Sequence, residues 1–376
     1  MIYMDNAATT RMKPEVARAM APYMGYKYAN PSGIYTFSSG VKKEINSARS
    51  QLAMSINADE KEIYITSGGT ESDNWALKMA ADEHKRGHII TSTIEHHAIL
   101  KSCAYLSERG TRITYAGVDA DGVIRLDELE RAIRPDTFLI SVMTGNNEVG
   151  TIQPIEQIAK LAKRYNILFH TDAVQAYTNI PIDVKAMDID MLSTSAHKIN
   201  GPKGIGFLYI KDGVLKTPFI NGGGQESGMR AGTENVAGIM GFAEASRIAV
   251  STMKQRTSYE IRMRDYLIER VLKEIPDSRL NGHRINRLAN NCNFSFKSVD
   301  GASLIVMLDQ QGICASAGSA CSSGSKSGSH VLKAMGLTDE LVHSAVRLTL
   351  NEEISRREVD YVVKCLAQDI EELRSL

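Results

Sequence analysis

Residues 62–92 read EIYITSGGTESDNWALKMAADEHKRGHIITS, and this stretch decides the fold class. Glu62–Thr66 has the apolar, β-branched composition of a strand, Glu71–Lys85 has the pattern of a helix, and His88–Ser92 again favours a strand. A strand, a helix and a second strand in this order form the repeating unit of parallel sheets. We therefore expect a mostly parallel sheet that binds its ligands at the carboxyl ends of its strands.

The same alternation continues to about residue 210. A helix is predicted at Ile155–Tyr165, and further strands at Phe138–Met143, Ile167–His170, Asp190–Ser193 and Ile205–Ile210. From about Asn235 the pattern changes to one long helix, Val236–Ile275, followed by short strands at Asn293–Phe296 and Ala345–Leu350 and a charged terminal helix. We predict an α/β protein with a large, mostly parallel sheet domain (residues 15–255, helices on both faces) and a smaller α+β domain (residues 1–14 with 256–376).

The composition narrows the classes of function. The 376 residues are 43% hydrophobic and 23% charged, with 44 basic and 44 acidic side chains. A balanced charge disfavours nucleic-acid or membrane-surface binding driven by bulk charge. There is no apolar run of ~18 residues and no signal-peptide pattern at the N-terminus. No cysteines form a CxxC pair, which disfavours a structural zinc site or a disulfide framework and favours the cytoplasm; they are Cys103, Cys292, Cys314, Cys321 and Cys365.

Two polar groups follow predicted strands late in the sheet. Lys198 ends the run Ser193-Thr194-Ser195-Ala196-His197-Lys198, before a glycine-rich turn. Such a lysine suits a Schiff base with an aldehyde, with Ser195 and His197 as phosphate donors; an ordinary solvated loop lysine is the alternative. Asp172 follows Ile167–His170, where an acid can pair with a pyridinium nitrogen and Gln175 can reach a ring oxygen. The alternative for Asp172 is a helix N-cap.

Two more groups of candidate site residues follow earlier predicted strands. Gly69 and Thr70 open the helix after the first strand, a position that favours phosphate; the alternative is an ordinary capped helix start. His96 follows His88–Ser92 and can stack on a cofactor ring and move protons. A purely structural histidine is the alternative for His96, and the spacing of its neighbours disfavours a metal site.

Three further candidates lie elsewhere in the sequence. Cys321 sits in the segment 315–329, where ten of fifteen residues are Ser or Gly, a composition typical of a flexible loop. A thiol there can travel between a substrate and an acceptor, or it can be incidental. Asn147 follows the run that ends at Met143. Arg347 alternates with apolar residues and suits a bidentate carboxylate contact or a salt bridge within a strand.

These motifs, taken in order, closely resemble the cysteine desulfurases, a class V aminotransferase group of fold-type I pyridoxal-phosphate (PLP) enzymes. The resemblance spans nearly the whole chain. It is carried by Asp5-Asn6-Ala7-Ala8-Thr9-Thr10, Ser67-Gly68-Gly69-Thr70-Glu71-Ser72-Asp73-Asn74, Asn146-Asn147-Glu148-Val149-Gly150, His170-Thr171-Asp172, His197-Lys198, Gly232-Thr233-Glu234-Asn235, Gly318-Ser319-Ala320-Cys321 and Arg347.

The resemblance implies a role for each candidate around the cofactor. Lys198 binds pyridoxal 5′-phosphate covalently, and His96 stacks on its ring. The remaining cofactor contacts are assigned to Asp172 (ring nitrogen), Gln175 (ring oxygen), Gly69, Thr70, Ser195 and His197 (phosphate), and Thr233 (phosphate of the partner subunit). The contact from Thr233 makes a homodimer necessary for a complete site.

The resemblance also implies the reaction and its partners. Asn147, Arg347 and Asn30 bind the carboxylate of L-cysteine, and Cys321 takes the sulfur as a persulfide while alanine leaves. A proton acceptor such as His96 assists the thiol. The sulfur passes to an acceptor protein, such as an iron–sulfur scaffold or a tRNA-thiolation enzyme. Cys321 is expected as a transient iron–sulfur ligand, and no intrinsic metal site is expected. A selenocysteine lyase, another aminotransferase-type reaction and a non-catalytic subunit are the alternatives.

Overall fold

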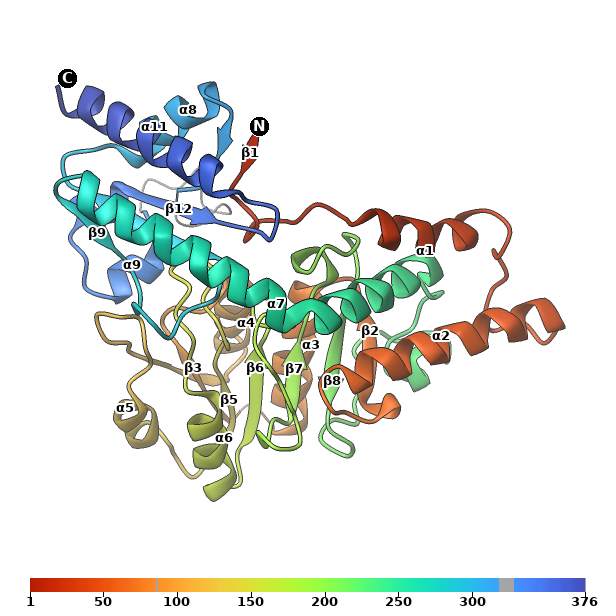
Figure 1. The fold of residues 1–376 in the computed structure, drawn as a ribbon. Helices are drawn as coiled ribbons and strands as arrows, with labels where there is room; N and C mark the ends of the chain where they lie inside the picture. The colour runs from red at the N-terminus through yellow and green to blue at the C-terminus, as the bar shows by residue number, and fades with distance from the viewer. Residues whose placement is uncertain (86, 318–327, 376) are drawn as a thin grey trace.

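The computed structural model describes residues 1–85, 87–317 and 328–375 (Figure 1). Cys321 lies outside these described residues. A seven-stranded sheet has the order β2-β8-β7-β6-β5-β3-β4, and all neighbours run parallel except β8, which is antiparallel to both β2 and β7. Its strands are β2 (Ile63–Thr66), β3 (His88–Ser92), β4 (Arg112–Ala116), β5 (Thr137–Ser141), β6 (Leu168–Asp172), β7 (Met191–Ser193) and β8 (Gly206–Ile210).

Helices cover both faces of this sheet. On β3, Ile89 packs into a core with Trp75 of α3, whereas the next residue, Ile90, packs into the opposite core with Phe169 of β6. Successive strand residues point to opposite faces, so both faces need apolar cover. The first core lies under α3 (Gly69–Glu83) and α4 (His97–Ser107). The second lies under α2 (Thr36–Met54), α6 (Ile155–Arg164) and the first half of α7 (Val236–Glu274), with α1 (Pro14–Met24) and α5 (Leu126–Arg131) nearby.

A third core surrounds a smaller antiparallel sheet of order β12-β10-β9. Leu267 of α7, Phe294 and Val363 are fully buried in it. The N-terminal strand joins this part of the molecule by pairing with β11, as Figure 1 shows. The elements are β1 (Ile2–Tyr3), β9 (Ser278–Leu280), β10 (Asn291–Phe296), α8 (Gly301–Gln310), β11 (Ile313–Cys314), α9 (His330–Ala334), α10 (Asp339–His343), β12 (Ala345–Thr349) and α11 (Arg356–Ser375). Short 3₁₀ segments are η1 (Glu60–Glu62), η2 (Ala196–Lys198) and η3 (Gln225–Gly228).

The predicted α/β architecture with a mostly parallel sheet is confirmed. The predicted domain boundary at residue 255 falls within α7, which runs unbroken through it. The division into two domains stays a prediction. The strand β4 was not predicted from the sequence, because it is an edge strand whose side chains are largely accessible. No helix in the described part of the chain combines the length and apolar character needed to cross a membrane.

Candidate active site

The carboxyl ends of the parallel strands meet at one cavity of about 360 Å³. Sites for cofactors and other small molecules typically have volumes of about 300–1,000 Å³. Ten of the residues singled out by sequence line this cavity: Gly69, Thr70, His96, Asn147, Asp172, Gln175, Ser195, His197, Lys198 and Arg347. Nine of them come from the segments after β2, β3, β5, β6 and β7, so the strand-end rule places these nine at the same edge of the large sheet. Arg347 reaches the cavity from β12 of the smaller sheet.

Lys198 ends the short 3₁₀ segment η2, just past β7. Its Nζ donates hydrogen bonds to the carbonyl oxygens of Ala7 (2.6 Å) and Ala8 (2.8 Å). The Gln175 side chain donates to the same Ala7 oxygen at 2.9 Å. The N-terminal segment thus crosses the cavity, and its carbonyl groups orient the lysine amine.

Two buried carboxylates face the cavity from different elements. Asp172 ends β6, and its side chain accepts a hydrogen bond from the Val174 amide at 2.9 Å. Asp73, on α3, is 1% exposed, and its Oδ1 has no hydrogen-bond partner among the described residues. Burial raises the pKa of both, and it raises that of Asp73 well above the usual value because Asp172 adds like-charge repulsion. His96 and Lys198 oppose the shift at Asp172, so Asp172 is the carboxyl that ionises first.

His96 completes this group, since one ligating atom each of Asp73, His96 and Asp172 lies within 4.8 Å of the others. His96 is the N-cap of α4, where its Nδ1 accepts a hydrogen bond from the Ala98 amide at 3.1 Å. The ring proton therefore resides on Nε2, which acts as a donor, whereas a metal ion needs a bare nitrogen. The ionised Asp172 of this group suits a cationic ring nitrogen, whereas the His96 N–H suits an acceptor atom.

The N-terminus of α3 lies at one end of the site, a position that suits an anion. A second, more open cavity adjoins the first there and shares Gly69, Thr70, Ser195 and His197 with it, while Lys203 adds a positive charge. A Cβ atom at Gly69 would lie 2.5 Å from Val174 Cγ2, so the backbone can come this close only as glycine. Burial lowers the pKa of His197 to about 4, helped by Lys198 and Lys203, so His197 is a neutral donor at this end.

Arg347 closes the opposite end of the cavity. The side chain is 1% exposed; Nη2 donates to Asp5 Oδ1 at 2.7 Å and Nη1 to the carbonyl oxygen of Asn147 at 3.1 Å. Its Nε has no hydrogen-bond partner among the described residues. A buried guanidinium with an unused donor suits a carboxylate ligand.

These donors fit pyridoxal phosphate. The helix N-terminus with Ser195 and His197 suits the phosphate, the buried Asp172 suits a protonated ring nitrogen, and Lys198 suits the aldehyde carbon. Asp73 and Arg347 both line the cavity, and each has a buried polar atom without a hydrogen-bond partner among the described residues, which suits a polar ligand.

Some predicted residues lie elsewhere. Asn30 and Thr233 are exposed and do not line the cavity of the single chain, and Cys321 lies outside the described residues. Conversely, Asp5 contacts Arg347, and Asp73, His97, Glu148 and His330 line the cavity without having been assigned a role. Asp73 had a usable signal, because it follows Gly69 by four residues and so shares its helix face.

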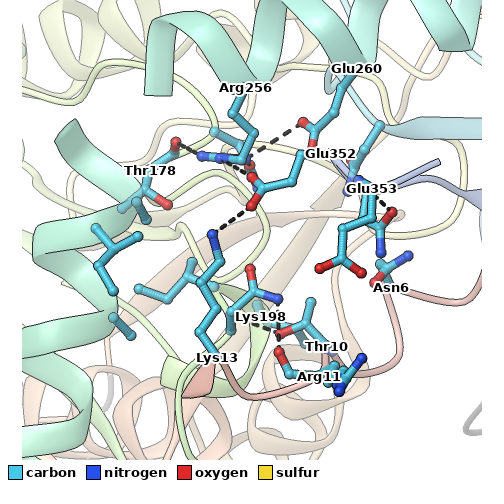
Figure 2. Close-up of a pocket in the computed structure, with 18 of the residues that line it drawn as sticks. Asn6, Thr10, Arg11, Lys13, Thr178, Lys198, Arg256, Glu260, Glu352 and Glu353 are labelled. Atoms are coloured by element: carbon cyan, nitrogen blue, oxygen red, sulfur yellow. Dashed lines mark hydrogen bonds and ion pairs between the residues drawn. The ribbon is translucent and has the colours of Figure 1, made fainter. Parts of the chain in front are cut away.

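A separate cavity of about 150 Å³ lies beside Lys198, between α7 and the N-terminal segment (Figure 2). A row of ion pairs crosses it: Lys13 to Glu352 (2.5 Å), Glu352 to Arg256 (3.8 Å) and Arg256 to Glu260 (3.5 Å). Burial raises the pKa of Glu260 to about 7. This network links α7 to the chain that follows β12.

Comparison with known proteins places this site in context. The family model for class-V aminotransferases matches residues 2–362. The cysteine desulfurase IscS of Methanosarcina thermophila is 49% identical over 377 residues, covering 100% of this chain and 93% of that protein. A NifS-like protein of known structure has a TM-score of 0.92 and 37% identity, with 100% of both chains covered. SspA in complex with cysteine has a TM-score of 0.83 and 36% identity, covering 94% of this chain and 99% of that one.

Proposed function

The chain belongs to the class-V aminotransferase family and is a PLP-dependent cysteine desulfurase, and we propose how its residues divide the work. The observation that carries the proposal is the single cavity that joins Lys198, Asp172, the α3 N-terminus and Arg347. Lys198 would hold the cofactor. Asp172 and Gln175 would hold its ring, His96 would stack on the ring, and Gly69, Thr70, Ser195 and His197 would hold its phosphate.

The substrate is L-cysteine. Arg347, with Asn147 beside it, would bind the α-carboxylate, because the guanidinium is buried and keeps an unused donor. When bound, the cofactor supplies an electron sink that stabilises negative charge at the substrate's α-carbon. Lys198, held by the Ala7 and Ala8 carbonyl groups, would take the α-proton.

Cys321 would receive the sulfur. Its thiolate would form an S–S bond with the substrate sulfur while the substrate's C–S bond breaks, and that bond's electron pair would remain on carbon. Carbon would then be protonated, which gives alanine. The persulfide would pass to an acceptor protein, such as an iron–sulfur scaffold or a tRNA-thiolation enzyme, since the thiol must be cleared before a second turnover.

We further propose that the working unit is a homodimer in a reducing cytoplasm. Large apolar side chains are exposed along the segment between α1 and α2, among them Tyr28 (75%), Ile34 (102%) and Tyr35 (56%). Exposed apolar patches of this kind mark interaction surfaces. Thr233, which is also exposed, would complete the partner's phosphate site, and Asn30 would join the substrate site. The described cysteines are free thiols, as expected in such a compartment.

The experiment is a cysteine assay on the cofactor-loaded protein. L-cysteine should yield alanine over many turnovers when a reductant clears the persulfide. Lys198→Ala should abolish covalent cofactor attachment and alanine release. Alanine formation that survives in Lys198→Ala would refute the assignment of Lys198. A selenocysteine lyase would instead act on selenocysteine and leave cysteine unchanged.

A further inference from the structure

Four histidines line the candidate site, and the proposed function uses His96 and His197 but neither His97 nor His330. His96 and His97 stand at the start of α4, and His330 is the first residue of α9. The ring centroids of His97 and His330 are 4.9 Å apart, and those of His96 and His97 are 6.4 Å apart. His330 therefore reaches the cavity from an element remote in sequence.

His96 is a poor proton acceptor in this geometry. The Ala98 amide donates to its Nδ1 at 3.1 Å, which occupies the lone pair of that nitrogen. The proton then resides on Nε2, so the ring can donate but has no unused acceptor. The expectation that His96 deprotonates a thiol therefore finds no support in these contacts.

His330 has the complementary arrangement. Its Nε2 lies 3.0 Å from the carbonyl oxygen of Glu95. A carbonyl group can only accept, so Nε2 carries the proton and donates it. That leaves Nδ1 with a lone pair, as the proton-accepting atom of the ring.

The neighbouring residue holds this orientation. Ser329 caps α9, because its Oγ accepts from the Leu332 amide at 3.2 Å. The same hydroxyl donates to Glu148 Oε2 at 2.5 Å, and Glu148 is 1% exposed. The ring is thus anchored through Glu95 on one side and through Ser329 and Glu148 on the other. An anchored base loses little entropy when it reacts.

We propose that His330 is the proton acceptor for the attacking thiol, which the proposed function assigns to Cys321. In this step the S–H bond breaks, the proton forms an Nδ1–H bond, and sulfur keeps the electron pair as a thiolate. No oxidant or reductant is needed. The thiolate is the reactive form of cysteine, so the step generates the nucleophile.

The charged and titratable groups around His330 come from three elements. Glu95 and His96 lie between β3 and α4, His97 begins α4, Glu148 follows β5, and Lys198 follows β7. Burial raises the pKa of Glu95 to about 8. Burial first, and then His330, His96 and Lys101, lower the pKa of His97. The Glu148 carboxylate, reached through Ser329, favours a cationic ring after proton transfer, whereas Glu95 with its raised pKa is neutral below about pH 8.

The test is a single-turnover measurement of persulfide formation, by acid quench and mass spectrometry, between about pH 6 and pH 9. In His330→Gln the amide group keeps a donor for the Glu95 carbonyl but cannot accept a proton. We expect the rate near pH 6 to fall by roughly 100-fold. The deficit should shrink as the pH rises, because thiols then ionise unaided. Imidazole in the buffer should restore part of the rate in His330→Ala.

The control is His343→Gln, which replaces an exposed histidine at the end of α10. It should match the wild type, and cofactor absorbance should show that all variants are loaded. A His330→Gln rate within about threefold of wild type at every pH would overturn the proposal. A pH-independent loss without imidazole rescue would also overturn it, because that result indicates a structural role. Wild-type protein that forms no persulfide would overturn the proposed function itself, and this inference with it.

Discussion

At the residue scale, the buried carboxyl groups of Asp73 and Asp172 lie close to each other and to His96. Two carboxylates in such a place cannot both ionise at low cost, so one of them keeps its proton. The larger rise in pKa is at Asp73. Asp73 is therefore the neutral partner, and under the proposed function Asp172 carries the charge that would face the cofactor ring.

A pair of isosteric variants tests which of the two carboxyl groups carries the charge. Asp73→Asn mimics a protonated carboxyl, so it should change alanine turnover by less than about tenfold, which is about 1.4 kcal/mol. Asp172→Asn removes the ionised group and should cost on the order of 100-fold or more, about 2.7 kcal/mol. Steady-state assays with matched cofactor loading make the comparison. Equal losses in the two variants would contradict the assignment.

The sequence predicts much of this site because its residues follow strands. Asp172, His96, Asn147 and Lys198 each come just after an apolar run, and parallel strands bring such positions together. His330 follows no strand, and nothing in the Ser- and Gly-rich segment before it indicates a place in the cavity. Asp5 was equally hidden, because its contact with Arg347 joins residues 342 positions apart.

At the element scale, the junction of β2 and α3 depends on the absence of a side chain at Gly69. An added Cβ atom would meet Val174 Cγ2 at 2.5 Å, and the Val174 amide donates to Asp172. Crowding there moves the loop that holds the ring acid. The close approach of α3 to β6 thus links the phosphate end of the site to the ring end.

Gly69→Ala should weaken cofactor binding by about tenfold, since overpacking costs about 1–3 kcal/mol. Titration of the cofactor-free protein with pyridoxal phosphate measures this directly. The control is Gly40→Ala on α2, where an added Cβ atom meets nothing within 4 Å. That exposed helix position should gain up to about 1 kcal/mol in stability without a change in affinity. An unaltered affinity of Gly69→Ala for pyridoxal phosphate would argue against the close approach of Gly69 to Val174.

Helices and strands were predicted well where a single hydrophobic pattern runs along the whole element. β3 has the predicted bounds, and α6 and α7 differ from theirs by one residue at the C-terminal end. The edge strand β4 was missed because neighbouring strands, not a continuous apolar run, make it a strand. The two-residue strands β1 and β11 exist only through their mutual pairing, which no local pattern encodes.

At the scale of the whole molecule, the row of ion pairs in Figure 2 joins the N-terminal segment, α7 and the chain that follows β12. Glu260 is 3% exposed and pairs with Arg256 at 3.5 Å. Because burial raises its pKa from 4.5 to about 7, the folded protein holds this proton at pH values where the unfolded chain has lost it. Stability from this group is complete below about pH 4.5 and is lost as the pH rises through 7.

Glu260→Gln should remove the part of the pH dependence of stability that arises from Glu260. Between pH 5 and pH 8 the wild type should lose up to about 3 kcal/mol of unfolding free energy relative to the variant. Urea unfolding at several pH values measures the difference. Glu353→Gln, at an exposed position of the same cavity, should follow the wild type. Parallel pH profiles for wild type and Glu260→Gln would contradict a raised pKa.

The central claim is that this fold delivers sulfur from cysteine to one thiol of its own. The most direct measurement is the intact mass of the loaded protein after brief exposure to L-cysteine without reductant, with the modified peptide then identified. The account predicts a gain of one sulfur atom on the peptide that contains Cys321, and no gain in Cys321→Ser. An unmodified wild-type protein, or sulfur carried on another cysteine such as Cys314, would contradict it.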